Sequence, residues 1–352
     1  MSELDARGAP VNLSASGTTT ADASPAGPRG TDGGQSGGSR FGQFILRYGI
    51  VLALLVLGAF FASQTDAFLT GYNLRLILLQ ASVNTIFALG ITFVIITAGI
   101  DLSVGSTAGL VGMVAAIAMK SGFGFTDGPL PWGVAVGLGL LVGVAVGLVN
   151  GLLITSLRIT PFIVTLGMLS VARGLTLIVS EGRPVYGLPK GFSQFFGGTW
   201  RGIPMPVLIA AVLALLSWFL LRSTRLGEYT YAIGGNEEAT RLSGVNVAAT
   251  KISIYTLCGL FAALAGLVYA ARLGNAEPNA AQGYELNAIA ATVMGGTSLF
   301  GGEGGVVGTI VGALIIATLL NGLVLLNVQA YYQTLAIGLV IILAVALDRF
   351  RQ

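Results

Sequence analysis

The chain has no histidine, one cysteine and few charged residues, and each shortage excludes a class of chemistry. Without histidine there is no histidine ligand for a metal and no histidine base to activate a nucleophile. Cys258 has no second cysteine with which to form an intrachain disulfide. None of the lysines, Lys120, Lys190 and Lys251, lies in the G-x-x-x-x-G-K-[ST] loop that binds nucleotide phosphates. We therefore expect no metal and no cofactor in this chain, and any ATP that drives it must be bound by another protein.

Charged residues make up only 9% of the 352 residues, whereas hydrophobic residues make up 54%. In soluble domains about a quarter of the residues are charged. Together with a mean hydropathy of +0.84, this composition predicts an all-α protein that crosses a membrane many times. The net charge of +3 is small and no cluster of Lys and Arg stands out, so a nucleic-acid surface is not indicated. The apolar segments also lack an acid–base pair, which argues against a membrane enzyme.

Large apolar side chains are scarce in residues 1–40, which are rich in Gly, Ser, Thr, Ala and Pro. Burial of such a segment cannot offset the entropy lost on ordering, so we predict a disordered tail before a transmembrane domain at 41–352. The tail has no apolar stretch typical of a signal peptide, and the first hydrophobic span is expected to direct insertion.

About 20 apolar residues are needed for a helix to cross the hydrocarbon layer. By that measure we predict about ten spans. The eighth is short and is expected to be re-entrant or tilted. The predicted spans are Ile45–Ser63, Leu74–Ala98, Val104–Lys120, Pro131–Thr155, Thr160–Ser180, Pro204–Arg222, Ile252–Arg272, Leu286–Leu299, Gly304–Asn327 and Ala330–Leu347.

The distribution of basic residues predicts which side of the membrane each loop faces. An even number of crossings puts both termini on one side, and the larger set of Lys and Arg residues falls on that side. Cytoplasmic loops carry an excess of Lys and Arg, so the tail, the C-terminus and the loop at 223–251 are predicted to be cytoplasmic.

The loop at 223–251 carries the signals of one short helix, roughly Asn236 to Ser243. Asn236 suits the N-cap, Glu237 and Glu238 favour the first turn, Arg241 falls near the end, and Gly244 suits the position after the C-cap. So short a helix is marginal in water, and it needs a partner surface. Ala239 and Leu242 form a small apolar stripe that suits docking to another protein. The alternative is a capped helix with no role beyond the loop.

Polar residues within the apolar segments are candidates for the translocation pathway. Asp101 has two compatible interpretations: it caps a helix that begins at Leu102, with Ser103 as a second polar group, or it lines the pathway. Arg173 lies near the middle of the fifth span and must find a partner or water. Asn150 and Asn321 favour hydrogen bonds between helices over binding of substrate.

Two glycine-rich interruptions share the pattern G-x-x-L-x-x-G, at residues 99–105 and 296–302. Each follows an apolar span and precedes a glycine-rich helix. Interrupted segments in the two halves of a transporter indicate a pathway at a repeat interface.

The segment Glu238–Gly244, EATRLSG, resembles the EAA-x-x-x-G signature of the coupling loop in bacterial ATP-binding-cassette import permeases, with Thr240 in place of the second Ala. GIDLSVGS, the NG-L at Asn150, TPFIVTLGM, YELNAIAATVMGGTSLFGGEGGVVGT and NGLVLL occur in the order found in ribose-type monosaccharide permeases. The resemblance covers about Phe44 to Asp348.

This resemblance implies an inner-membrane permease subunit for monosaccharides and related polyols. It also implies a second permease chain, identical or paralogous, a cytoplasmic ATPase that binds the ATP, and a periplasmic sugar-binding protein. An ion-coupled secondary sugar transporter or a channel is the alternative. A secondary carrier would place several carboxylates or histidines in its spans, whereas Asp101 is nearly alone here.

Overall fold

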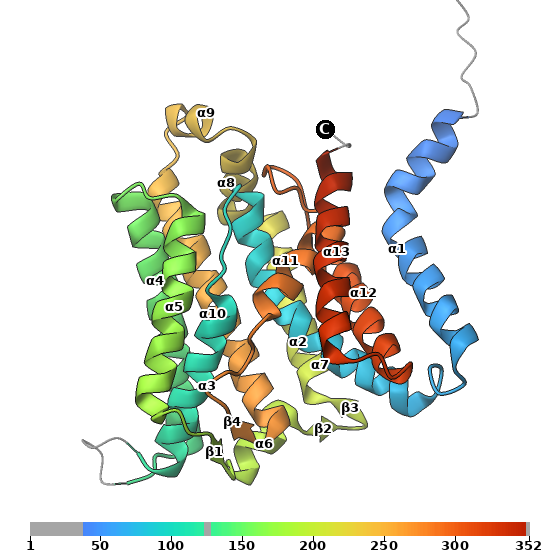
Figure 1. The fold of residues 1–352 in the computed structure, drawn as a ribbon. Coiled ribbons are helices and arrows are strands. Elements are labelled where there is room, and N and C mark those ends of the chain that lie inside the picture. The colour runs from blue at the N-terminus through green and yellow to red at the C-terminus, as the bar shows by residue number, and fades with distance from the viewer. Residues whose placement is uncertain (1–37, 123–127, 350–352) are drawn as a thin grey trace, which may run out of the picture. The chain divides into compact units, whose positions relative to one another are not determined.

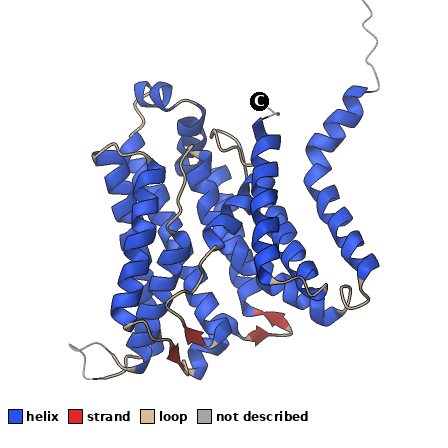
Figure 2. Cartoon of the chain, in the orientation of Figure 1, coloured by secondary structure: helices blue, strands red, loops and turns tan. Residues whose placement is uncertain are grey.

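The computed structural model of the chain describes residues 38–122 and 128–349. The chain divides into two units, Met1–Phe44 and Ile45–Gln352, and the second contains all the helices from α2 to α13. The predicted disordered tail lies outside the described residues, except that the first helix already includes Gly38 to Arg40. The predicted all-α architecture is confirmed: helices dominate the described chain, and the strands form only two short ribbons (Figure 2).

The long helices follow the predicted spans closely. Their bounds are α1 Gly38–Gln64, α2 Gly71–Ile96, α3 Val104–Lys120, α4 Trp132–Ser156, α5 Pro161–Ser180, α7 Met205–Ser223, α10 Val247–Leu273, α12 Val306–Leu325 and α13 Ala330–Arg349. Within the described residues, α2, α4, α5, α7, α10 and α12 are long and apolar enough to cross a membrane. Shorter apolar helices lie at Gly49–Gln64, Val104–Lys120 and Ala330–Ala346.

Shorter elements gather at the two ends of these helices. Helices α8 (Arg225–Gly235) and α9 (Glu237–Leu242) lie at the end where α7 finishes and α10 begins (Figure 1). The opposite end carries α6 (Lys190–Gly197) and two antiparallel ribbons. In these ribbons β1 (Val185–Tyr186) pairs with β4 (Asn275–Ala276), and β2 (Thr199–Trp200) pairs with β3 (Ile203–Pro204).

Helix α2 is the centre of the second unit. Every residue from 81 to 96 is buried, and the helix contacts α7, α10, α11 (Tyr284–Met294) and α12. A helix that is mostly apolar on all sides is buried either among other helices or in lipid. Between residues 81 and 96 it is the neighbouring helices that cover α2.

Two non-helical interruptions lie between helices, and each corrects one prediction: the bounds of the eighth span and the capping role of Asp101. The eighth predicted span, Leu286–Leu299, is helical only as α11, which ends at Met294, and the chain from 295 to 305 is non-helical. Likewise residues 97–103 separate α2 from α3, whose N-cap is Ser103, so Asp101 does not cap a helix that begins at Leu102. The second interruption reaches the end of α2, where the Gly302 amide donates to the Ile96 carbonyl at 2.9 Å.

Helices α4 and α10 approach each other through glycines. A Cβ at Gly147 would lie 2.9 Å from the Cα of Thr256 and closer still to the carbonyl oxygen of Tyr255. A Cβ at Gly143 would lie 2.6 Å from the carbonyl oxygen of Gly259. In a membrane, small residues let backbones approach and supply packing that the hydrophobic effect does not. The glycines of the fourth span therefore set the distance between α4 and α10.

We expect Gly147→Val to push α4 from α10 and lower the free energy of unfolding by about 1–3 kcal/mol, as overpacking does elsewhere. Gly137→Val is the matched control, because no atom of another element lies within 4 Å of a Cβ at that position on the same helix. Thermal unfolding in detergent, followed by circular dichroism, measures the difference. Equal midpoints for the two variants would contradict this packing.

Candidate functional site

Helix α9 begins and ends at the residues that its sequence predicts. The Asn236 side chain accepts a hydrogen bond from the Ala239 amide at 2.9 Å, which satisfies one of the free amides of the first turn. At the other end Gly244 has φ of +84°, and its amide donates to the Arg241 carbonyl at 3.0 Å. A positive φ costs glycine little, so the helix stops here. The predicted helix between Asn236 and Ser243 is confirmed.

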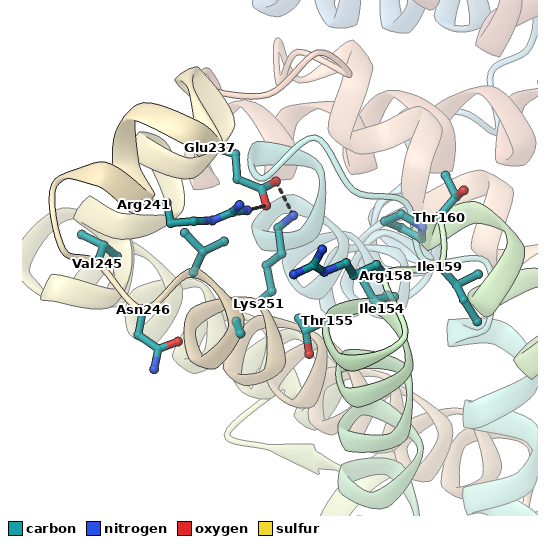
Figure 3. A pocket seen from close by; sticks show the side chains of 13 residues that line it. Ile154, Thr155, Arg158, Ile159, Thr160, Glu237, Arg241, Val245, Asn246 and Lys251 are labelled. Carbon is teal, nitrogen blue, oxygen red and sulfur yellow. Dashed lines mark hydrogen bonds and ion pairs between the residues drawn. The ribbon is translucent and has the colours of Figure 1, made fainter.

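Three ion pairs hold α9 in place (Figure 3). Arg241 bonds Glu237 at 3.0 Å, as Figure 3 shows. It also bonds Glu238, which the figure does not draw, at 3.2 Å within the helix. Lys251, in the second turn of α10, reaches back to the other oxygen of Glu237 at 2.6 Å. The last pair joins two elements rather than neighbours on one helix. Glu237 therefore connects α9 to α10.

The carboxyl group of Glu237 is partly buried, and burial alone would raise its pKa. The hydrogen bond and charge of Lys251, together with those of Arg241, outweigh burial and hold the pKa below its ordinary value. The ionised form is therefore the one that the fold favours at neutral pH.

The outer face of α9 is uncovered. Leu242 is 80% exposed and Ala239 is also exposed, whereas Thr240 is buried. The Thr240 hydroxyl donates to the Asn236 carbonyl at 2.7 Å, so the residue that departs from the EAA-type signature is satisfied within the helix. The predicted apolar stripe of Ala239 and Leu242 is thus presented outward.

Helix α8 was not predicted, and it links α9 to the end of α2 and to the segment from 295 to 305. The Thr224 side chain caps α8 by accepting from the Gly227 amide at 3.4 Å. Gly234 lies against the carbonyl of Ile96 and the amide of Gly302, with no space for a Cβ. The Tyr231 hydroxyl donates to the Gly304 carbonyl at 2.8 Å. The loop that carries α9 therefore touches the end of α2 and the non-helical segment from 295 to 305.

Three of the predicted pathway candidates form one buried cluster. The Asp101 carboxylate accepts from the Ser103 amide at 2.9 Å and from the Ser103 hydroxyl at 2.7 Å. Asn150 of α4 donates to the same hydroxyl at 3.0 Å. Cys258 of α10 also lies within hydrogen-bonding reach of Asp101. The cluster joins the interruption before α3 to α4 and α10, and all of its members are buried in this conformation.

Two other candidates lie away from this cluster. Arg173 donates from one nitrogen to the carbonyls of Pro278 at 2.7 Å and Ala280 at 3.2 Å, which anchors the segment before α11. Asn321 of α12 and Asn73 of α2 exchange hydrogen bonds at 2.8 and 2.9 Å. This reciprocal pair joins two helices, the interaction that we predicted for Asn321.

Two further residues belong with these sites and were not singled out from the sequence. Lys251 forms the ion pair to α9. The sequence feature that could have indicated it is a lone lysine at the start of a long apolar helix. Glu285 interacts with Arg173 and has one oxygen, Oε2, that is buried without a hydrogen-bond partner in the described structure. The sequence feature that could have indicated Glu285 is a carboxylate directly before the short eighth span. No group of three or more Cys, Asp or Glu in the described residues is placed to hold a metal ion.

Comparison with known proteins identifies this architecture. Residues 73–345 match the family described as branched-chain amino acid transport system / permease component. The chain belongs to this family of permeases. It is 48% identical over 309 residues to the ribose import permease protein RbsC of Escherichia coli K12, which covers 86% of this chain and 93% of that protein.

Two further relatives agree with this assignment, and the resemblance to ribose-type permeases is confirmed. The ribose import permease protein RbsC of Bacillus subtilis is 44% identical over 311 residues, with 88% of this chain and 94% of that protein covered. The D-allose transport system permease protein AlsC of E. coli K12 is 43% identical over 310 residues, with 88% and 93% covered. No solved structure matches the chain.

We expect Glu237→Gln to loosen α9, because the variant loses the charge that binds both Lys251 and Arg241. A nitroxide attached after Leu242→Cys should report greater mobility by electron paramagnetic resonance, and Cys258 is buried and should not compete for the label. Glu238→Gln is the control, since Glu238 bonds Arg241 alone. Equal loosening in both variants would contradict the role of Lys251.

The same ion pair predicts a pH dependence. Because the pKa of Glu237 is depressed in the folded chain, its stabilisation of α9 is present above the ordinary carboxyl value of 4.5 and is lost as the pH falls through the depressed value. The nitroxide of the otherwise unchanged chain should therefore become mobile below that pH, and that of the Glu237→Gln variant should be mobile throughout.

Proposed function

We propose that this chain is the membrane-spanning permease subunit of an ATP-driven importer for a monosaccharide or related polyol, and that a separate cytoplasmic ATPase moves it through α9. The observation that supports this most is the two-sided construction of α9. Its outer face offers Leu242 to a partner, while its inner face is fixed to α10 through Glu237 and Lys251. The relatives' names support a sugar as the substrate, since they include a pentose and a hexose permease.

We propose ten crossings. Six are the long apolar helices, and three are the shorter apolar helices of α1, α3 and α13. The tenth is α11 completed by the non-helical chain from 295 to 305, just as residues 97–103 complete α3. The end with α8 and α9, where α13 also finishes, faces the cytoplasm in this proposal, in agreement with the excess of basic residues there.

Three partners follow from this proposal. A cytoplasmic ATPase docks on α9, and a second permease chain, identical or paralogous, completes the passage. A periplasmic sugar-binding protein docks at the opposite end, where Tyr186, Phe195 and Trp200 are exposed beside α6 and the ribbons. Exposed aromatic residues are typical of protein interfaces, although they are also typical of the membrane boundary.

We propose that two routes carry the movement of α9 into the membrane. The first runs through Lys251 along α10 to Cys258, which lies against Asp101 and the interruption before α3. The second runs through α8, whose Gly234 contacts the end of α2 and Gly302, and whose Tyr231 contacts Gly304. Movement of the ATPase would therefore shift the two non-helical segments together. In this proposal, that shift at the interrupted helices produces alternating access.

The buried cluster of Asp101, Ser103 and Asn150 is the proposed pathway surface. These groups are covered in this conformation, so they meet sugar hydroxyls only after α10 has moved. Arg173 and Asn321 are assigned supporting roles instead, because each is engaged in hydrogen bonds that hold other parts of the fold.

We expect Gly244→Val to reduce ATP-driven sugar uptake about tenfold, because a branched side chain at φ of +84° carries about 1–3 kcal/mol of strain and distorts the end of α9. Gly244→Asn is the control, since asparagine tolerates this backbone conformation. Uptake of radiolabelled ribose and allose is measured in proteoliposomes with the ATPase and binding protein. The ATPase is assayed in parallel.

We expect uptake to be strongly reduced in Gly244→Val and retained in Gly244→Asn. Stimulation of ATP hydrolysis should change in parallel with uptake in both variants. Wild-type uptake by the valine variant would oppose a coupling role for α9. Uptake in vesicles that lack the ATPase would instead favour a secondary transporter or a channel.

A further inference from the structure

A groove of about 720 Å³ opens beside α9, between the turn that joins α4 to α5 and the loop that joins α9 to α10 (Figure 3). Its walls come from the ends of α4, α5 and α10. In the orientation proposed above, on which this inference rests, these apolar helices leave the membrane at that level on the cytoplasmic side. The wall residues are Ile154, Thr155, Arg158, Ile159, Thr160, Pro161, Glu237, Arg241, Val245, Asn246, Val247, Ala248 and Lys251.

The groove carries an excess of positive charge. Arg158, Arg241 and Lys251 line it, against the single carboxylate of Glu237. Arg241 and Lys251 both bond Glu237, whereas Arg158 forms no ion pair with any residue that the structure describes. The N-termini of α5 and α10, two long helices, also open into the groove at Pro161 and Val247 and add to the positive potential. The groove is therefore suited to an anion.

The side of the groove that continues into the membrane is apolar. Ile154 and Ile159 belong to its wall. Next to them Leu157, Phe162 and Ile163 are exposed, with fractions of 62%, 48% and 60%. A free anion gains nothing from such a surface. An occupant with an anionic head and long hydrocarbon chains uses both parts of the site.

We propose that this groove binds the phosphate headgroup of an anionic phospholipid, with Arg158 as the principal ligand and Lys251 and Arg241 beside it. Basic pockets between membrane helices at the cytoplasmic surface suit such headgroups, and each Lys or Arg near the surface contributes about 1 kcal/mol. The acyl chains lie along Leu157, Phe162 and Ile163. This site does not depend on the identity of the sugar or of the ATPase.

The site has a consequence for α9. A phosphate in the groove competes with Glu237 for Lys251 and Arg241, the two residues that hold α9. Bound lipid and the position of α9 are therefore linked. By the reciprocity of coupled binding, whatever moves α9 also changes the affinity for the lipid.

The test is retention of phosphatidylglycerol by the purified full-length chain after transfer from mixed phosphatidylcholine and phosphatidylglycerol nanodiscs into detergent, measured by native mass spectrometry. Wild type should retain phosphatidylglycerol in preference to phosphatidylcholine. Arg158→Gln should reduce this retention about fivefold, the equivalent of one lost charge contact. Arg158→Lys should restore most of it.

Arg225→Gln is the matched control, because Arg225 is exposed at the same end of the bundle but outside the groove. Circular dichroism of each variant shows whether it is folded, and Arg158→Lys keeps the test valid if the glutamine variant is not. Three results would overturn the proposal: equal retention in Arg158→Gln and wild type, equal retention of both lipids by wild type, or complete displacement of the lipid by inorganic phosphate.

Discussion

The ion pair between Glu237 and Lys251 is the contact on which the functional account depends. A helix of two turns has no stability of its own, and its caps set only where it begins and ends. The 2.6 Å bond to the second turn of α10 gives α9 a fixed position on a transmembrane helix. Because Arg241 bonds the same carboxylate, Glu237 stabilises both the helix α9 and its attachment to α10. In the proposed mechanism, force applied to Leu242 is thereby directed into α10.

Transmission beyond α10 requires contacts that do not yield, and glycines supply them. Gly147 and Gly259 bring the backbones of α4 and α10 together, and Gly234 brings α8 against the end of α2 and against Gly302. Backbone contacts of this kind leave no flexible side chain to absorb a displacement. In a bilayer the hydrophobic effect does not draw helices together, so close packing at small residues is what joins these elements. We propose that the same contacts transmit the movement of α9.

Features set by neighbouring residues were predictable from the sequence, whereas features set by distant ones were not. The apolar runs gave the spans, and Asn236 and Gly244 gave the ends of α9, because capping is local. The prediction that Asp101 caps a helix was wrong, because its carboxylate bonds Ser103. Ser103 in turn bonds Asn150, which lies 47 positions further along the sequence. Helix α8 was missed, and its contacts with the end of α2 and with the segment from 295 to 305 join residues far apart in the sequence.

Cross-linking of α9 within the assembled importer tests the central claim most directly. A thiol introduced by Leu242→Cys is exposed, the native Cys258 is buried, and Phe195→Cys places a control thiol at the opposite end. The account predicts that the thiol at 242 forms a cross-link to the ATPase whose yield changes with ATP, and that the thiol at 195 does not. Labelling at 242 by an impermeant reagent from outside the cell, with no cross-link to an ATPase, would contradict it.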